Sequence, residues 1–314
     1  MKQVFLLSKQ NLELSKQEVL ALTKTEYELI DNLLIQETKF KDYKRLAYTK
    51  RIYQLLFISY KDTLEQDLEN FNWNKIYKEN FCLRSIETKL DEANLAGYIW
   101  RKLKNPKVNL KNPKTEIHII KKGSKFLCCL LKYQNKELFE KRKAHLRPAL
   151  MPISLHPRLA RAIVNLTGIK TNETLLDPFC GTAGILIEAG LINIKPIGYD
   201  ISKKMLEKAE LNLKYYKIKD YHLEQQDALK IKTKFPYIIA DLPYGLNTKK
   251  SDLKELYLDF LKTLEKILTK KAVIIFPDFI NYKSLITKTN LNIEHEFDYF
   301  IHKSLTKKIV LISQ

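Results

Sequence analysis

The segment IIADLPYG, residues 238–245, places an acid, a proline and an aromatic ring directly after an apolar run. The apolar run predicts a buried strand that ends at Asp241. A plain turn from strand to loop requires neither a carboxylate nor a ring, so we expect a flat polar ligand here. Asp241 would accept its hydrogen bonds, Tyr244 would offer a face for stacking, and Pro243 would stiffen the loop between them.

Three further acids follow apolar runs in the second half of the chain: Asp177, Asp200 and Asp227. Parallel strands of a doubly wound sheet end at one edge, where such folds bind ligands, so the four acids would meet in one crevice. Asp200 lies 23 residues after Asp177 (200 − 177), near the offset of about 20 at which a carboxylate binds ribose hydroxyls. Asp227 would accept from an adenine amino group. Capping of strand ends would explain one or two such acids, but four are harder to dismiss.

The loop Pro178–Gly184 joins the first of these strands to a helix, and its small residues allow a ligand to approach the backbone. It has neither the G-x-G-x-x-G of dinucleotide sites nor the G-x-x-x-x-G-K-[ST] of P-loops, and a tight turn without a ligand is the alternative. Adenosine recognition without a pyrophosphate loop favours S-adenosylmethionine. The expected cofactor contacts are Asp177, Pro178, Phe179, Cys180, Gly181, Thr182, Gly184, Asp200, Asp227 and Ala228.

A methyl donor in this crevice requires an acceptor beside Asp241. The exocyclic amine of a nucleobase is a weak nucleophile because its lone pair is conjugated, and it needs two hydrogen-bond acceptors to hold its hydrogens. The Asp241 carboxylate and the carbonyl of Leu242 would provide them, once the base has left its stack. The expected catalytic residues are Asp241, Leu242, Pro243 and Tyr244. An amine needs no thiolate adduct, so Cys180 is interpreted as a small loop residue.

The charge of the chain is +19 with a pI of about 9.5, and it is concentrated in one block. Residues 101–150 hold 15 Lys and Arg against 3 Asp and Glu. Such a block predicts RNA as the partner, because lysine and arginine release counterions from phosphates; a surface rich in lysine without a partner is the alternative. The candidate RNA contacts are Lys121, Lys122, Lys125, Lys141, Arg142, Lys143 and Arg147.

Other classes of protein fit the sequence poorly. Its apolar runs are all shorter than the roughly 20 residues of a membrane helix, so we expect a cytoplasmic protein with no membrane partner. The four cysteines lack C-x-x-C spacing, which argues against a metal site and against a disulfide framework.

The first half, residues 1–145, reads as short strands alternating with helices and suggests two α+β units of ferredoxin-like or similar build. A capping-box pattern at Ser15–Glu18 opens a short helix that runs to Ala21. The expected strands and second helix are Gln3–Ser8, Tyr27–Gln36, Tyr53–Tyr60, Phe81–Ile86, the helix Asp91–Lys104, Thr115–Ile120 and Lys125–Tyr133.

Residues 146–157 contain three prolines and predict an extended linker. A helix from Pro157 to about Leu166 follows, and the pattern then alternates strand and helix. This predicts a doubly wound α/β domain over residues 158–314. We expect Asn292–Ser313 to form a β-hairpin with a turn near Ser304, and we assign it no chemistry.

The motifs DPFCGTAGILIEA and DLPYG, preceded by RPALMPISLHPRLARAIVNL, resemble the archaeal tRNA guanine-N2 methyltransferases that act at position 10. The resemblance implies a ferredoxin-like region and a THUMP domain before a Rossmann-like class I methyltransferase domain with a mostly parallel seven-stranded sheet. It implies that Pro178–Gly184, Asp200 and Asp227 bind S-adenosylmethionine. It also implies that residues 241–244 hold the guanine amine while the N-terminal half binds the tRNA acceptor end.

The chain departs from that family pattern at two positions. Ala183 stands where glycine is usual and would narrow the pocket, and Leu242 stands where proline is usual but keeps its carbonyl. The resemblance implies methylation of guanosine N2 in tRNA, giving N2-methyl- or N2,N2-dimethylguanosine. We expect a monomer, and an accessory subunit is the alternative. Another tRNA or rRNA position, adenine N6 as the target, and an RNA-binding scaffold without activity remain alternatives.

Overall fold

The computed structural model describes residues 1–150, 154–244, 250–302 and 305–314 of the chain. These residues form two compact units. Unit 1 comprises residues 1–12, 23–43 and 49–136. Unit 2 comprises residues 13–22, 44–48 and 137–314, so two short segments of the N-terminal half belong with the C-terminal half.

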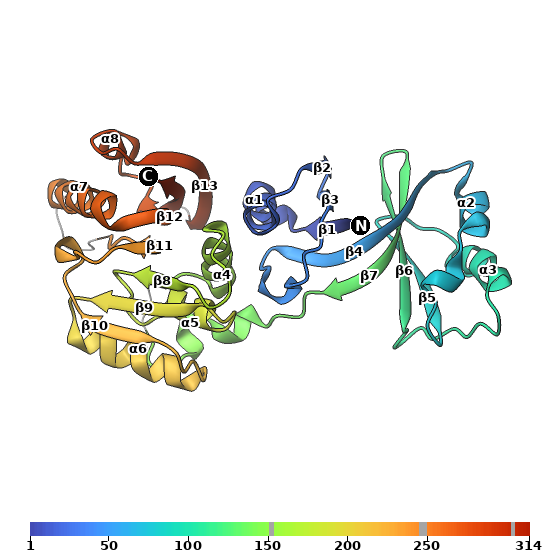
Figure 1. Cartoon of the computed structure of the whole chain (residues 1–314), viewed down its shortest axis with the longest axis horizontal. Helices are drawn as coiled ribbons and strands as arrows, with labels where there is room; N and C mark the ends of the chain where they lie inside the picture. The colour runs from blue at the N-terminus through green and yellow to red at the C-terminus, as the bar shows by residue number, and fades with distance from the viewer. Residues whose placement is uncertain (151–153, 245–249, 303–304) are drawn as a thin grey trace. The chain divides into compact units, whose positions relative to one another are not determined.

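Unit 1 is built on one seven-stranded sheet with the order β2-β3-β1-β4-β7-β6-β5 (Figure 1). Its pairs are antiparallel except β5 with β6. Helices α2 and α3 contribute Leu68 and Ile99 to an apolar cluster with strand residues such as Leu83. The elements are β1 (Lys2–Leu7), β2 (Tyr27–Ile30), β3 (Leu33–Glu37), β4 (Thr49–Tyr60), α2 (Leu64–Asn70), β5 (Phe81–Ile86), α3 (Glu92–Lys102), β6 (Thr115–Lys122) and β7 (Lys125–Gln134).

The predicted α+β pattern of this half is present, with local corrections. The run 27–36 is two strands rather than one, because Asp31 adopts a positive φ of 51° and reverses the chain. The capping-box prediction was wrong: α1 spans Leu12–Thr23, and Ser15 lies buried inside it. Strands β4 and β7 pair along most of their length, so the two predicted α+β units share one sheet.

Unit 2 confirms the predicted doubly wound α/β domain. Its sheet has the order β10-β9-β8-β11-β12-β14-β13, parallel from β10 to β12 and antiparallel from β12 to β13. The strands are β8 (Thr174–Asp177), β9 (Lys195–Asp200), β10 (His222–Gln225), β11 (Phe235–Asp241), β12 (Leu268–Pro277), β13 (Asn292–His302) and β14 (Leu305–Ser313). The helices are α1, α4 (Pro157–Leu166), α5 (Gly184–Gly190), α6 (Lys203–Tyr215), α7 (Lys250–Ile267) and α8 (Lys283–Ile286).

Alternate residues of the central strands pack against opposite layers of helix, as a sheet covered on both faces requires. Ile238 and Ala240 of β11 join a cluster with α7, whereas Ile239 joins a cluster with α4 and α5. The hairpin β13–β14 is confirmed, and its predicted turn near Ser304 lies outside the described residues. β14 runs antiparallel to β12 and pairs Lys307 with Pro277, so its first residues lie at the edge where the parallel strands end.

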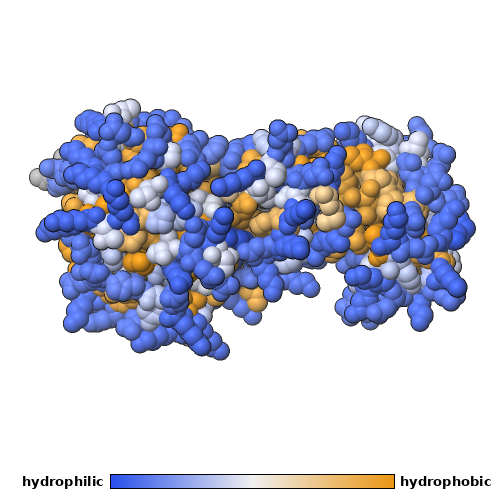
Figure 2. Space-filling model, viewed as in Figure 1, coloured by the Kyte–Doolittle hydropathy of each residue, from blue (hydrophilic) through white to orange (hydrophobic). Residues whose placement is uncertain are grey.

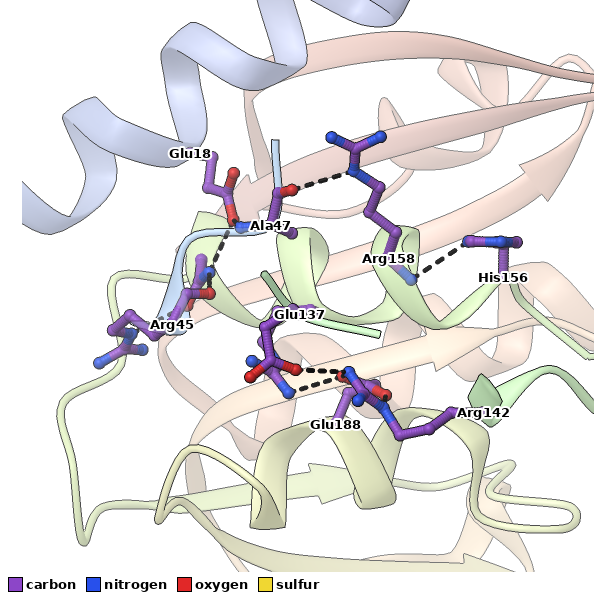
Figure 3. Close-up of polar contacts among 10 residues, drawn as sticks. Glu18, Arg45, Ala47, Glu137, Arg142, His156, Arg158 and Glu188 are labelled. Carbon is purple, nitrogen blue, oxygen red and sulfur yellow. Dashed lines mark hydrogen bonds and ion pairs between the residues drawn. The ribbon is translucent and has the colours of Figure 1, made fainter. Parts of the chain in front are cut away.

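The two N-terminal segments of unit 2 are held to α4 by a buried polar network (Figure 3). The carboxylate of Glu18 accepts from the backbone N–H groups of Ala47 and Tyr48 at 2.7 and 2.8 Å and from the side chain of Asn165 at 2.7 Å. Arg158 donates to the carbonyl of Ala47 at 2.9 Å. Because a buried carboxylate requires such partners, α1 and residues 44–48 are part of the structure that supports the second sheet.

The segment before α4 is irregular where it is described, with short 3-10 turns at Phe139–Arg142 and Ala144–Leu146. Its main anchor is Arg142, which donates to the buried Glu188 of α5 at 2.6 Å and to Glu137 at 3.1 Å (Figure 3). Among the helices that the structure describes, none is both long and apolar enough to cross a membrane.

Candidate active site

A pocket of about 500 Å³ lies at the carboxyl edge of the second sheet. All of the predicted cofactor contacts line it, and so do the four residues predicted to be catalytic. Further lining residues, which the sequence interpretation did not include, are Ser154, Leu155, Ile185, Ile201, Gln226, Leu229 and Leu256. The four acids predicted to converge do meet in this one pocket: Asp177, Asp200, Asp227 and Asp241.

The loop after β8 is fixed from the neighbouring strand β9. The backbone carbonyl of Tyr199 accepts from the N–H of Cys180 at 3.0 Å, and the Asp200 carboxylate accepts from the N–H of Gly181 at 3.0 Å. The second Asp200 oxygen accepts from the N–H of Ser202 at 2.9 Å. Asp200 therefore orders the loop and, through its remaining lone pairs, still has acceptor capacity toward the pocket.

Asp227 was predicted to end a strand, but β10 ends two residues earlier, at Gln225. It instead caps the 3-10 turn Ala228–Lys230, where its carboxylate accepts from the N–H of Leu229 at 3.0 Å. The side chain still lines the pocket, so the prediction that it faces the ligand does not depend on the strand boundary.

Ala183, the first departure from the family pattern, is buried and does not line the pocket. Its φ of 69° lies in the left-handed region, which disfavours a residue with a Cβ. We expected the added methyl to narrow the pocket. In the structure the methyl group does not line the pocket, and its cost is the left-handed backbone conformation of Ala183. This φ explains why glycine is usual at the position.

Asp241 is bonded from two directions. The hydroxyl of Tyr244 donates to its Oδ1, and Lys307 Nζ of β14 donates to Oδ1 at 3.1 Å and Oδ2 at 2.9 Å. Lys307 Nζ also lies 4.7 Å from the centroid of the Tyr244 ring. The turn is braced by Tyr257, whose hydroxyl donates to the carbonyl of Pro243 at 2.6 Å.

The assignment of no chemistry to the C-terminal hairpin therefore missed Lys307. Lys307 and Lys308 are neighbours of the same type, and nothing in the sequence distinguishes them. Lys307 reaches Asp241 because β14 runs antiparallel to β12. The first residues of β14 therefore lie at the pocket edge of the sheet. Leu242, the second departure from the family pattern, is fully buried in the core beside α7.

Asp177 is the fully buried acid of the pocket, and the charges of the neighbouring acids change its pKa. Burial raises the pKa of Asp177 well above its usual range, although the N–H of Phe179 donates to it, and the charges of Asp241 and Asp200 raise it further. Such a site favours a cationic ligand, because a positive group would offset the repulsion among the acids. A sulfonium with an adenosine and an ammonium group fits this combination of acids and apolar walls.

Cys180 is not poised as a nucleophile. Burial raises the pKa of its thiol, with smaller contributions from Asp177 and Asp200, so the reactive thiolate is disfavoured. This agrees with the interpretation of Cys180 as a small loop residue.

Three of the predicted RNA contacts have largely buried side chains, which corrects the predicted RNA surface. Lys122 is bonded to Asp31 at 2.7 Å and to Glu87, and Arg142 is bonded to Glu188. Arg147 is only 4% exposed, and burial lowers its pKa. These side chains are not free to neutralise phosphates. Lys121 and Lys141 are exposed, and Lys125 and Lys143 are partly exposed and pair with the exposed acids Glu28 and Glu140.

Comparisons with known proteins agree with this geometry. Residues 144–308 match the family of RMKL-like methyltransferase domains. The tRNA (guanine(10)-N2)-dimethyltransferase of Methanothermobacter thermautotrophicus is 33% identical over an alignment of 284 residues, and the match covers 86% of this chain and 84% of that protein. The enzyme of the same name from Pyrococcus abyssi is 34% identical over an alignment of 253 residues, and the match covers 76% of each chain.

A solved structure supports the fold. TrmN from Thermus thermophilus matches with a TM-score of 0.52 at 17% identity, covering 100% of both chains. At this identity the likeness concerns the architecture alone, and it agrees with the class I methyltransferase fold of unit 2.

Proposed function

The chain belongs to the family of archaeal tRNA (guanine(10)-N2)-dimethyltransferases, and on this premise we propose that it methylates the exocyclic N2 amine of a guanosine in tRNA. The proposed position is 10, with one or two methyl groups added. The observation that carries the proposal is that Asp241, the acceptor carboxylate, and Pro178–Gly184, the cofactor loop, line one pocket.

S-adenosylmethionine, when bound, supplies a methyl group on a sulfonium, an electrophile that an amine attacks. The proposed contacts are the loop Pro178–Gly184, Asp200 for the ribose and Asp227 for the adenine amine, with Asp177 close to the positive charge. The acids and apolar side chains of the pocket support this fit.

The chain's own residues orient the base. Asp241 accepts one amine hydrogen, the carbonyl of Leu242 accepts the other, and the ring of Tyr244 packs on the flat base. Holding both hydrogens concentrates the lone pair on N2 along the line of attack. The proton that N2 loses passes to Asp241 and then to solvent.

The assignment of tasks to three sequence regions is also a proposal, and these regions differ from the two compact units. Residues 1–145 would bind RNA as a ferredoxin-like region with a THUMP domain, 146–157 would connect, and 158–314 would methylate. Exposed and partly exposed lysines support RNA binding: Lys121, Lys125, Lys141 and Lys143. Hydrophilic side chains cover most of the visible face in Figure 2. We propose a cytoplasmic monomer.

The test is methylation of an unmodified tRNA transcript by the recombinant protein with isotopically labelled S-adenosylmethionine. We expect N2-methylguanosine or N2,N2-dimethylguanosine in the nucleoside digest, and fragment mapping should place it at position 10. Label in adenosine would overturn the guanine assignment. RNA binding without transfer, together with no binding of the donor in equilibrium dialysis, would indicate a scaffold.

A variant tests the role of the acceptor. Asp241→Ala should keep donor binding and lower turnover by about 100-fold or more, the usual cost of losing a transition-state hydrogen-bond partner. Asp220→Ala is the matched control, because Asp220 is an exposed acid of the same unit, paired with Lys195 at 3.3 Å. Equal turnover in the two variants would exclude Asp241 as the acceptor.

A further inference from the structure

Lys307 and Asp241 form a shielded ion pair inside the proposed active site. The Lys307 side chain is 5% exposed and that of Asp241 is 18% exposed, and both carboxylate oxygens accept from the one ammonium. Lys307 lies on β14 and Asp241 on β11, with β12 between them, so the long lysine side chain crosses a whole strand to make this contact.

The Asp241 carboxylate shares its pocket with other acids. Asp177 and Asp200 belong to the same pocket, and the charge of Asp241 acts on the buried Asp177. The charged and titratable groups around the Asp241 carboxylate are Asp177 on β8, Asp200 on β9, Tyr244 in its own loop, Tyr257 on α7 and Lys307 on β14.

Resting on the proposed function, we propose that Lys307 is a positioning residue for methyl transfer, whose ammonium holds the Asp241 carboxylate turned toward the acceptor amine and places a positive charge against it. An ammonium in contact with both oxygens fixes the plane of the carboxylate and compensates the neighbouring acids. Protonation of Asp241 would turn one of its acceptor sites into a donor, and the carboxyl could not take up the proton that the amine releases.

The arrangement leaves room for the substrate. A carboxylate has about four lone-pair sites, of which Tyr244 and Lys307 occupy three in the structure. The fourth site is sufficient for one amine hydrogen, and the carbonyl of Leu242 accepts the second. Lys307 can therefore stay bonded to Asp241 while the base is bound.

The balance of the step follows. The N2 lone pair forms the new N–CH3 bond, the S–CH3 bond breaks with its electron pair left on sulfur, and a proton leaves N2 for the anionic Asp241. Lys307 exchanges no proton. Its contribution is electrostatic, so it should appear in kcat and in its dependence on pH rather than in the binding of donor or RNA.

The test is the pH dependence of kcat for Lys307→Met, Lys307→Arg and wild type between pH 5.5 and 9, with a saturating tRNA transcript and S-adenosylmethionine. Lys307→Met should move the acidic limb of the profile up by about 1–3 pH units, the usual effect of removing a close opposite charge. Below that limb its kcat should fall about tenfold per pH unit, and near pH 9 it should recover most of the wild-type value, with the remaining deficit measuring the lost orientation of the carboxylate. Lys307→Arg should keep the wild-type profile.

Lys308→Met is the matched control. Lys308 is the next residue on β14 but pairs with Asp298 at 2.8 and 2.9 Å, away from the pocket. Its profile should match wild type. Donor affinity by calorimetry and the KM for tRNA should be unchanged in Lys307→Met, which also verifies that the variant is folded.

Two results would overturn the proposal: a Lys307→Met profile that is parallel to wild type at every pH, or undiminished kcat at pH 5.5. Recovery at high pH in the same sample excludes misfolding as the cause of the loss. If wild type itself transfers no methyl group to tRNA, the proposed function fails. If wild type is active and Lys307→Met behaves like it, only the role of Lys307 fails.

Discussion

Arg161 of α4 and Glu188 of α5 form an ion pair of 2.7 Å between side chains that are 2% and 0% exposed. Arg142 bonds the same carboxylate at 2.6 Å. Since α5 begins at Gly184, directly after the cofactor loop, this cluster fixes the helix that carries the loop.

Replacing Glu188 should therefore be costly. Glu188→Gln leaves two guanidinium groups without their buried anion and should lower the free energy of unfolding by about 3–5 kcal/mol. Urea denaturation measures the change. Glu210→Gln, which removes an exposed pair with Lys214 on α6, should cost less than about 1 kcal/mol. Equal losses would contradict a structural role for the buried cluster.

Adjacent basic residues should behave differently toward RNA. Lys141 is exposed, and its replacement by Gln should weaken tRNA binding and reduce the slope of log affinity against log salt by about 1. Arg142→Gln should leave that slope unchanged and lower stability, because Arg142 is bonded to Glu188 and Glu137. Filter binding at several salt concentrations separates the two. If only Arg142→Gln reduced the slope, Arg142 rather than Lys141 would be the residue that contacts RNA.

Asp177 should make stability depend on pH. Burial raises its folded pKa above the unfolded value, so between the two values the folded state binds more protons, and stability falls as pH rises through this window. Asp177→Asn keeps an acceptor for the Phe179 N–H but removes the charge. Its stability relative to wild type should therefore be higher at pH 7 than at pH 4, as measured by chemical denaturation. The same difference at both pH values would mean that Asp177 is not ionised unfavourably in the folded state.

Replacement by alanine should lower the stability of the protein at Gly198 and raise it at Gly97. A Cβ at Gly198 would lie 2.5 Å from Leu186 and 3.0 Å from Cys180, so Gly198→Ala should destabilise by about 1–3 kcal/mol and weaken donor binding by displacing the loop. Gly97 lies inside α3, where a Cβ meets only Arg101 at 3.9 Å. Gly97→Ala should stabilise by up to about 1 kcal/mol. Thermal melts and calorimetric titration check both, and a stabilised Gly198→Ala would refute the close packing of strand and loop.

Local patterns were sufficient to predict one side of the site. The run from Asp177 to Gly184 is a contiguous strand, loop and helix, and the strand-end acids follow from the shared edge of a parallel sheet. The same reasoning failed for side chains whose role depends on distant partners. Lys122 and Arg142 are indistinguishable in sequence from exposed neighbours, and only Asp31 and Glu188, brought by other elements, remove them from the surface.

Lys307 and Glu18 were missed for a related physical reason. Each lies in a region whose local pattern suggests an unrelated role, Lys307 in the terminal hairpin and Glu18 in a helix of the N-terminal half. Their contacts with Asp241 and Asn165 join residues 66 and 147 positions apart. Sequence spacing carries no information about such pairs.

The membership of residues 13–22 and 44–48 in unit 2 has a practical consequence for engineering. A truncated protein that begins at residue 144, where the match to the family begins, would lack the segment that carries Glu18. It would also lack Ala47 and Tyr48, which belong to the apolar cluster beside α4. A fusion of unit 2 with a different binding module would therefore have to keep residues 13–22 and 44–48 or replace the apolar surface that they cover.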